Sequence, residues 1–174
     1  MTTALVPGSF NPIHLGHVAI IETVAATFQR VVVAAVGNPS KAPDPFSLEQ
    51  RRALIEASVA HLANVETAIG SGLVVDLARA LGADVIVKGL RGLADFETEV
   101  QMAHMNRTMA GIPTLFVPTS LEHGHLASSL IREIARLGGT VDAMVPTPVA
   151  HALDLLAERT RPHSPGSLPS PGSS

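Results

Sequence analysis

The chain of 174 residues has no cysteine, no tryptophan and no tyrosine, and only five phenylalanines. Without cysteine it can form neither a disulfide nor a thiolate metal site, and it has no cysteine nucleophile. No apolar run approaches the roughly 20 residues that a membrane-spanning helix needs. The N-terminus also lacks the charged and apolar regions of a signal peptide. These absences predict a cytoplasmic protein that does not act in a membrane.

Charged residues are also few, with 12 Lys and Arg against 15 Asp and Glu, for a net charge of −3. Proteins that bind nucleic acids generally present a basic face, so we expect no nucleic-acid partner. Hydrophobic residues make up 46% of the chain. A chain of this length buries roughly two thirds of its unfolded surface, so the composition predicts one ordinary folded domain.

Strand-like and helix-like segments alternate along the chain. Short β-branched runs are expected to form strands at 2–5, 31–36, 65–69, 84–89 and 114–118. Helical periodicity predicts helices over 17–28, 47–62, 73–82, 95–111, 128–139 and 149–159. This order predicts an α/β fold with a doubly wound, five-stranded parallel sheet in a single domain, residues 1–160. Residues 161–174 are rich in Pro, Ser and Gly and are expected to form a disordered tail.

Polar residues follow several of these strands. Ser9, His14 and His17 follow the first, and Lys41 follows the second. Lys88 to Arg91 follow the fourth, and Ser128 and Ser129 open a helix, with Arg132 one turn later. Parallel strands end at one edge of their sheet, and ligands bind there near a switch in strand order. Helix N-termini also favour anions. The sequence therefore predicts a crevice for a small polyphosphate.

The stretch PGSFNPIHLGH, residues 7–17, leads from the first strand into a helix. We expect Gly8 to allow a sharp turn, Pro12 to end the strand and Gly16 to leave room for a phosphate. His17 is then expected to begin the helix with its ring beside the polyphosphate. The H-x-G-H spacing at a junction of strand and helix favours a functional site over a plain turn.

GSFNPIHLGH resembles the H-x-G-H signature of the nucleotidyltransferase superfamily, which has a Rossmann-like fold. Three further segments resemble one branch of it, phosphopantetheine adenylyltransferase: NPSK at 38–41, GLVVDLAR at 72–79 and VKGLRGLADFETEVQMAHMNR at 87–107. The resemblance covers residues 4 to about 157, nearly the whole of the predicted domain.

The resemblance implies transfer of AMP from ATP to 4′-phosphopantetheine, which yields dephospho-CoA and pyrophosphate in coenzyme A biosynthesis. Attack on the α-phosphorus would be in line, with no covalent enzyme intermediate. It also implies Mg²⁺ bound mainly through the ATP phosphates, a homohexamer, and CoA as a candidate inhibitor. Such chemistry relies on positioning and charge stabilisation, which suits a chain with no evident nucleophile–base pair.

Site residues follow from the same resemblance. His17, Lys41 and Arg91 would be catalytic. The acceptor would contact Ser9, Lys41, Leu73, Val74 and Lys88. ATP would contact Ser9, Phe10, His14, His17, Gly89, Leu90, Arg91, Glu99, His123, Gly124, His125, Leu126, Ala127, Ser128 and Ser129.

Departures from the branch leave alternatives open. Asn11 and His14 stand where many members have Asp and Thr. These two departures favour a nicotinate or nicotinamide mononucleotide adenylyltransferase as the alternative. Ala127 replaces a serine of the phosphate loop, and Lys88 replaces a common arginine. The other hypotheses are a related enzyme with an altered acceptor and a non-catalytic sensor of ATP or CoA. His17 and Lys41 argue against a sensor, because a binding protein has no need of donors aimed at a transition state.

Overall fold

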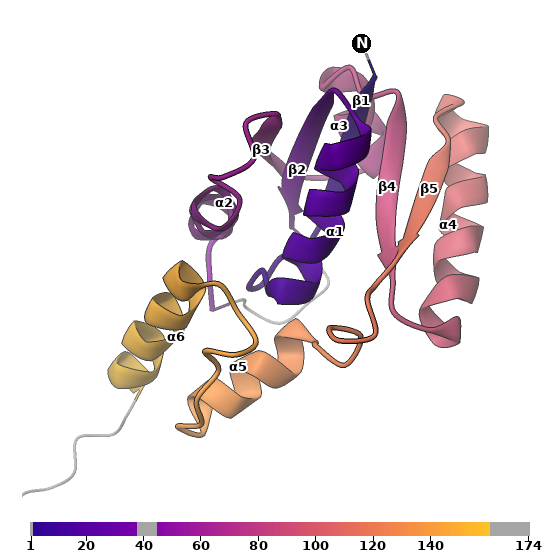
Figure 1. Cartoon of the computed structure of the whole chain (residues 1–174). Helices are drawn as coiled ribbons and strands as arrows, with labels where there is room; N and C mark the ends of the chain where they lie inside the picture. The colour runs from indigo at the N-terminus through magenta and orange to yellow at the C-terminus, as the bar shows by residue number, and fades with distance from the viewer. Residues whose placement is uncertain (1, 38–44, 161–174) are drawn as a thin grey trace, which may run out of the picture.

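The computed structural model describes residues 2–37 and 45–160. Five strands alternate with helices along the chain (Figure 1). The strands are β1 Thr3–Gly8, β2 Arg30–Val36, β3 Val65–Gly70, β4 Val85–Leu90 and β5 Thr114–Pro118. The helices are α1 Leu15–Thr27, α2 Leu48–Ser58, α3 Val74–Ala80, α4 Leu93–Ala110, α5 Ser128–Arg136 and α6 Thr147–Thr160.

The strands form one parallel sheet in the order β3-β2-β1-β4-β5. The chain builds outward from β1 to β3 and then returns to add β4 and β5 on the other side of β1. Leu5 of β1 therefore pairs with Val32 of β2 and with Ile86 of β4. The order switches between β1 and β4, and the predicted doubly wound parallel sheet is confirmed.

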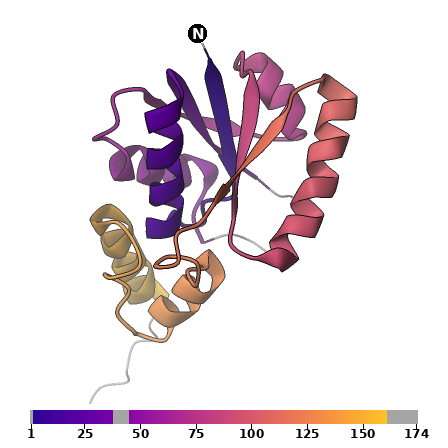
Figure 2. The same cartoon turned by 45° about the vertical axis from the view of Figure 1, so that its right-hand side comes forward.

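Alternate residues of each strand face two separate cores, as the pleat of a strand requires. On one face, Val6, Val33 and Val87 pack in a cluster with α1, α2, α5 and α6. On the other face, Leu5, Val32 and Ile86 pack against Val75 and Ala78 of α3. Figure 2 shows the sheet between α1 on one side and α4 on the other. Coverage of both faces explains why the strands are apolar runs without alternation.

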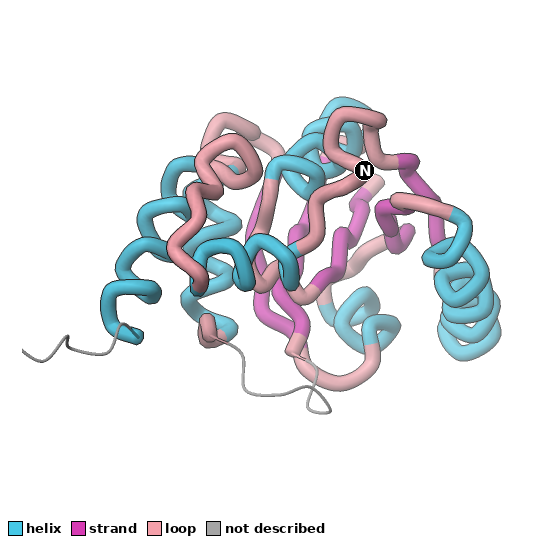
Figure 3. The backbone as a smooth tube through the Cα atoms, turned by 90° about the horizontal axis from the view of Figure 1, so that it is seen from below, coloured by secondary structure: helices cyan, strands magenta, loops and turns pink. Residues whose placement is uncertain are grey.

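The two last helices lie beyond the carboxyl ends of the strands. Figure 1 shows α5 and α6 below the sheet, and Figure 3 views the molecule from that end. Leu15 donates its N–H to the carbonyl of Met144 at 3.0 Å, which ties the start of α1 to the segment between α5 and α6. These two helices therefore close one side of the sheet edge where ligands are expected.

Local boundaries differ from prediction around the first turn. β1 ends at Gly8, four residues before Pro12, and α1 begins at Leu15 with His14 as its N-cap. His17 is thus the third residue of the helix and does not begin it. In contrast, the capping box expected at α2 is present. Ser47 donates its N–H to Gln50 Oε1 at 2.8 Å, and the backbone N–H of Gln50 donates to Ser47 Oγ at 3.2 Å. None of the helices within 2–37 and 45–160 has the length and apolarity needed to cross a bilayer.

Candidate active site

A cleft of about 910 Å³ lies at the carboxyl ends of the strands, around the switch between β1 and β4. Its polar lining comes from β1, α1, β4, α4 and α5, segments that are far apart in sequence. The functional groups that line it include Ser9, His14, His17, Lys88, Arg91, Thr98, Glu99, Thr119, Ser128, Ser129 and Arg132.

The backbone turns sharply after β1. Phe10 has a φ of 41°, in a region that residues with a side chain rarely adopt. A Cβ atom at Gly8 would lie 2.9 Å from Cε2 of Phe10, so the glycine lets the phenylalanine ring fold back over the strand end. The ring is 3% exposed and belongs to the core. The predicted turn at Gly8 is therefore present, and Phe10 can face a ligand mainly through its backbone.

His17 is held in one orientation by its neighbours. Its Nδ1 accepts the backbone N–H of His14 at 3.2 Å, so in the neutral ring the proton sits on Nε2. The ring stacks on His14 at a centroid distance of 3.7 Å and meets Phe10 edge to face at 5.0 Å. Burial, followed by His14, Arg91 and Lys88, lowers the pKa of His17 well below 6.5. A neutral N–H donor therefore lines the cleft at neutral pH.

His14 is 3% exposed, and within the described residues its Nδ1 has no hydrogen-bond partner. Burial, then the charges of Arg91 and His123, lowers its pKa from 6.5 to about 4. A Cβ at Gly16 would lie 3.1 Å from the His14 ring and 3.3 Å from Cβ of His123. The absence of a side chain at Gly16, which lines the cleft, thus lets these two histidines approach the helix.

The cleft is positively charged. Lys88, Arg91 and Arg132 line it, and Glu99 is the only carboxylate among its described lining residues. Lys88 Nζ lies 3.2 Å from Glu99 Oε1, with both side chains about 30% exposed. Arg91 donates to the carbonyl of Leu126 at 3.4 Å. This excess of positive charge suits an anion with several phosphates.

The N-terminus of α5 closes the cleft on one side. Ser128 Oγ donates to the carbonyl of Pro12 at 2.9 Å, and Arg132 donates to the carbonyl of Asn11. A hydroxyl has a single hydrogen to donate, so this bond leaves Ser128 to offer a phosphate its backbone N–H. The N-terminus of α5 and the turn after β1 are in this way joined into one unit.

Most of the residues predicted from sequence meet in this cleft: Ser9, Phe10, His14, His17, Val74, Lys88, Gly89, Arg91, Glu99, Ala127, Ser128 and Ser129 all line it. Others predicted with them do not line it. Leu126 is buried, Leu73 is 55% exposed, and Leu90, His123, Gly124 and His125 lie nearby in sequence but outside the lining. Lys41 lies outside the described residues, as does the predicted tail at 161–174.

Arg132, which the sequence places one turn into the helix that Ser128 opens, also lines the cleft. Thr98 and Thr119 line it too, although no role was predicted for them. Thr119 Oγ1 is buried without a partner among the described residues. Thr119 could have been found from the sequence, because it directly follows β5 and the strand-end rule that selected Ser9 and Lys88 applies to it as well. Thr98 is on a helix, where sequence spacing gives no such signal.

A metal site built from protein side chains alone would need several carboxylates or histidines together. Over 2–37 and 45–160, no three His, Asp or Glu residues come close enough to hold an ion.

Stability should fall in acid because of His14. Its pKa is about 4 in the folded chain and about 6.5 unfolded, so between these values the unfolded chain binds more protons. The free energy of unfolding is therefore expected to fall as the pH drops from 7 to 4, by on the order of 3 kcal/mol from this group. Urea titrations of a His14→Thr variant should show a shallower dependence. His104→Gln, at an exposed position on α4, is the control, and equal slopes in both variants would contradict this role of His14.

Comparisons with known proteins agree with this geometry. The model of the cytidylyltransferase-like family matches residues 5–134. The chain is 52% identical to phosphopantetheine adenylyltransferase of Synechococcus sp. (strain JA-2-3B'a(2-13)), over 86% of this chain and 94% of the relative. It is 53% identical to the enzyme of that name from Synechococcus sp. (strain JA-3-3Ab), with the same coverage.

A crystal structure described as a nicotinate-nucleotide adenylyltransferase from Vibrio parahaemolyticus superimposes with a TM-score of 0.62. It covers 88% of this chain and 99% of its own at 18% identity, which establishes a common fold only. With identity above half over nearly the full length of the curated relatives, and the cleft at the predicted sheet edge, the chain belongs to the phosphopantetheine adenylyltransferase family of cytidylyltransferase-like enzymes and is an adenylyltransferase.

Proposed function

We propose that this adenylyltransferase moves AMP from ATP to 4′-phosphopantetheine and releases dephospho-CoA and pyrophosphate. The identity of 52–53% with relatives named phosphopantetheine adenylyltransferase supports this acceptor. The observation that carries the chemistry is the His17 ring, whose proton sits on Nε2 in a cleft where Lys88 and Arg91 converge.

In the proposed reaction, an oxygen of the acceptor phosphate attacks the α-phosphorus in line, and the bond to the β-phosphate oxygen breaks. The electron pair leaves with pyrophosphate, so no side chain must take or give a proton. Negative charge builds on the non-bridging α-oxygens and on the leaving group. Catalysis then consists of holding the groups in line and stabilising that charge.

Each group of the cleft has a part in this step. His17 Nε2–H would donate to an α-phosphate oxygen, and as a neutral donor it has less hydration to lose than a cation has. Lys88, oriented by Glu99 at 3.2 Å, would hold the acceptor phosphate, with Val74 beside the pantetheine arm. Arg91, Arg132 and the free N–H groups at the start of α5 would receive the departing pyrophosphate. Lys41 would bridge the two reacting phosphates, as the family resemblance implies.

We propose that Mg²⁺ enters with ATP and is held mainly by its phosphates. Glu99, the cleft carboxylate among the described residues, already pairs with Lys88, which supports a cation carried by the nucleotide. Bound in this way, the metal would neutralise part of the phosphate charge. A cytoplasmic location and inhibition by CoA, which carries the same pantetheine arm, complete the proposal.

An adenylyltransferase acting on nicotinate or nicotinamide mononucleotide is the second candidate. The motif GSFNPIH favours it, whereas the structural similarity at 18% identity speaks for the fold alone. A sensor of ATP or CoA that does no chemistry would bind nucleotide without turnover. One assay distinguishes these three functions.

The protein incubated with ATP, Mg²⁺ and 4′-phosphopantetheine is expected to release pyrophosphate in step with formation of dephospho-CoA. Nicotinate mononucleotide and nicotinamide mononucleotide, supplied separately, should give no pyrophosphate above background. Turnover with a pyridine nucleotide alone would overturn the proposed acceptor. ATP binding without turnover on any of the three would identify a sensor.

His17→Ala should lower kcat by roughly 10²–10³ while the Kd for ATP changes little, because the donor acts on charge that develops in the transition state. His151→Ala removes an exposed histidine of α6 and is the matched control. Steady-state kinetics and calorimetric titration with ATP measure the two quantities. An unchanged kcat would refute the part given to His17.

We also propose a homohexamer. Met102, Met105 and Met109 are 42–55% exposed on α4, and Leu115 on the edge strand β5 is 48% exposed. Exposed apolar side chains of this kind favour burial against further copies of the chain. Light scattering on the full chain should give six times the mass of one chain, 18.1 kDa. A mass equal to one chain would contradict it.

A further inference from the structure

Arg51 is a charged residue inside the core. It lies in α2, one turn before Ile55, and both side chains face inward, with Arg51 only 3% exposed. Removing a guanidinium from water costs free energy unless its N–H groups are hydrogen-bonded. An apolar residue at this position would avoid that cost, so the guanidinium must make contacts that an apolar side chain could not make.

The guanidinium joins the turn after β1, which lines the cleft, to the segment just before α2. Nε donates to the carbonyl of Phe46 at 2.9 Å, just before α2, and Nη1 donates to the carbonyl of Ser9 at 3.2 Å, just after β1. Arg51 itself does not line the cleft, whereas Ser9 and Phe10 do. The Ser9 carbonyl is therefore held by a residue of α2 that lies outside the cleft lining.

Peptide geometry carries this constraint to the next residue. The Ser9–Phe10 bond is trans, and in a trans peptide the carbonyl and the following N–H point in opposite directions. With the Ser9 carbonyl bound to Arg51, the N–H of Phe10 is directed away from that guanidinium, and both Ser9 and Phe10 line the cleft. Among residues 2–37 and 45–160, no group accepts a hydrogen bond from this N–H.

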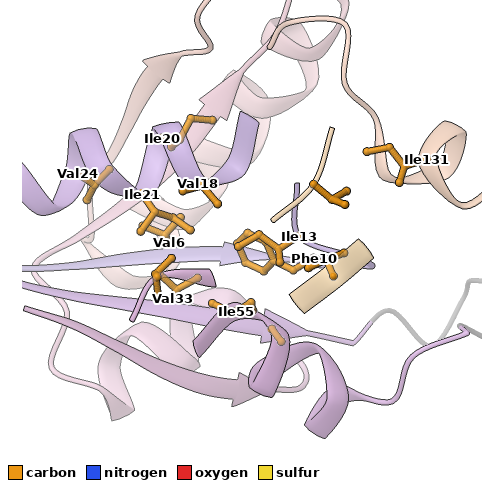
Figure 4. Close-up of a cluster of buried hydrophobic side chains, with 14 of the residues drawn as sticks. Val6, Phe10, Ile13, Val18, Ile20, Ile21, Val24, Val33, Ile55 and Ile131 are labelled. Atoms are coloured by element: carbon orange, nitrogen blue, oxygen red, sulfur yellow. The ribbon is translucent and has the colours of Figure 1, made fainter. Parts of the chain in front are cut away.

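Phe10 would not adopt this conformation unaided. A φ of 41° lies in the left-handed region, which is strained for a residue with a side chain. One anchor is its ring, which packs in the buried cluster beside Ile13 (Figure 4). The other is the carbonyl on Arg51, which fixes the peptide plane before it. With only the ring packing or only the carbonyl bond, the Ser9–Phe10 peptide plane could still rotate.

We propose that Arg51 is a positioning residue that aims the Phe10 N–H at the phosphates of the nucleotide. It acts through the Ser9–Phe10 peptide and touches no substrate. The proposal rests on the adenylyl transfer proposed above, because an N–H fixed in place stabilises developing phosphate charge without reorganising during the reaction. The buried charge is retained in the core because a fork of two N–H groups is needed to fix the plane.

Arg51→Lys tests this, since lysine keeps the charge but lacks the rigid fork that spans both carbonyls. We expect kcat to fall about 10–100-fold with the KM for ATP changed less than about threefold, as for a misplaced catalytic group. Arg52→Lys is the matched control: Arg52 neighbours Arg51 on α2, is only partly buried and pairs with Glu56 at 2.9 Å, and kcat should stay within about twofold. A folded Arg51→Lys protein with the kcat of the wild type, and only a lower Tm, would overturn the proposal.

A second measurement needs no folded variant of Arg51. In wild-type protein labelled with ¹⁵N at its five phenylalanines, the Phe10 amide signal is identified by its loss in Phe10→Leu. ATP should shift this signal in the wild type, and the shift should be smaller in Arg51→Lys where that variant folds. No shift in the wild type on saturation with ATP would overturn the proposal.

The two measurements separate this proposal from the proposed function. The amide shift depends on ATP binding alone, whereas turnover depends on the acceptor. A shifted Phe10 amide in a protein that does not turn over 4′-phosphopantetheine would support the positioning by Arg51 and overturn the acceptor.

Discussion

The site depends on the fixed backbone between β1 and α1. Three carbonyls of this turn, those of Ser9, Asn11 and Pro12, each accept a hydrogen bond from a side chain of another element. Arg51 reaches it from α2, and Arg132 and Ser128 reach it from α5. A loop held by its carbonyls on two sides has little freedom to move, and the His17 ring packs directly against it through His14 and Phe10.

The charge distribution follows from this scaffold. The chain is acidic overall, at −3, yet the cleft gathers Lys88, Arg91 and Arg132 against Glu99. Desolvation by burial, and after it the surrounding positive charge, lowers the pKa of both His14 and His17 and keeps the two rings neutral. Because Nδ1 of His17 already accepts the N–H of His14, the neutral ring offers the cleft only its Nε2–H donor, which suits a reaction in which the enzyme stabilises charge and exchanges no proton.

Stability and function compete at this site. A buried guanidinium, a phenylalanine at positive φ and a buried imidazole without a partner for Nδ1 among the described residues each cost folding free energy. All three lie around one turn at the switch point of the sheet, while the strands themselves are filled with Val, Ile and Ala. The apolar cores on both faces of the sheet offset these costs.

The sequence alone determined the class of the fold and the edge where the site lies. Strand and helix periodicity, with right-handed crossovers, left few topologies, and the strand-end rule selected Ser9, Lys88, Arg91 and Ser129 without knowledge of strand order. Tertiary structure decided the contacts between distant segments, which local sequence patterns do not specify. Arg51 lies in a helix beside polar residues, and only packing shows that it points inward to Ser9. Likewise, Ser128 donates to Pro12, a bond across 116 positions, because contacts between distant segments depend on how the elements pack and not on their spacing along the chain.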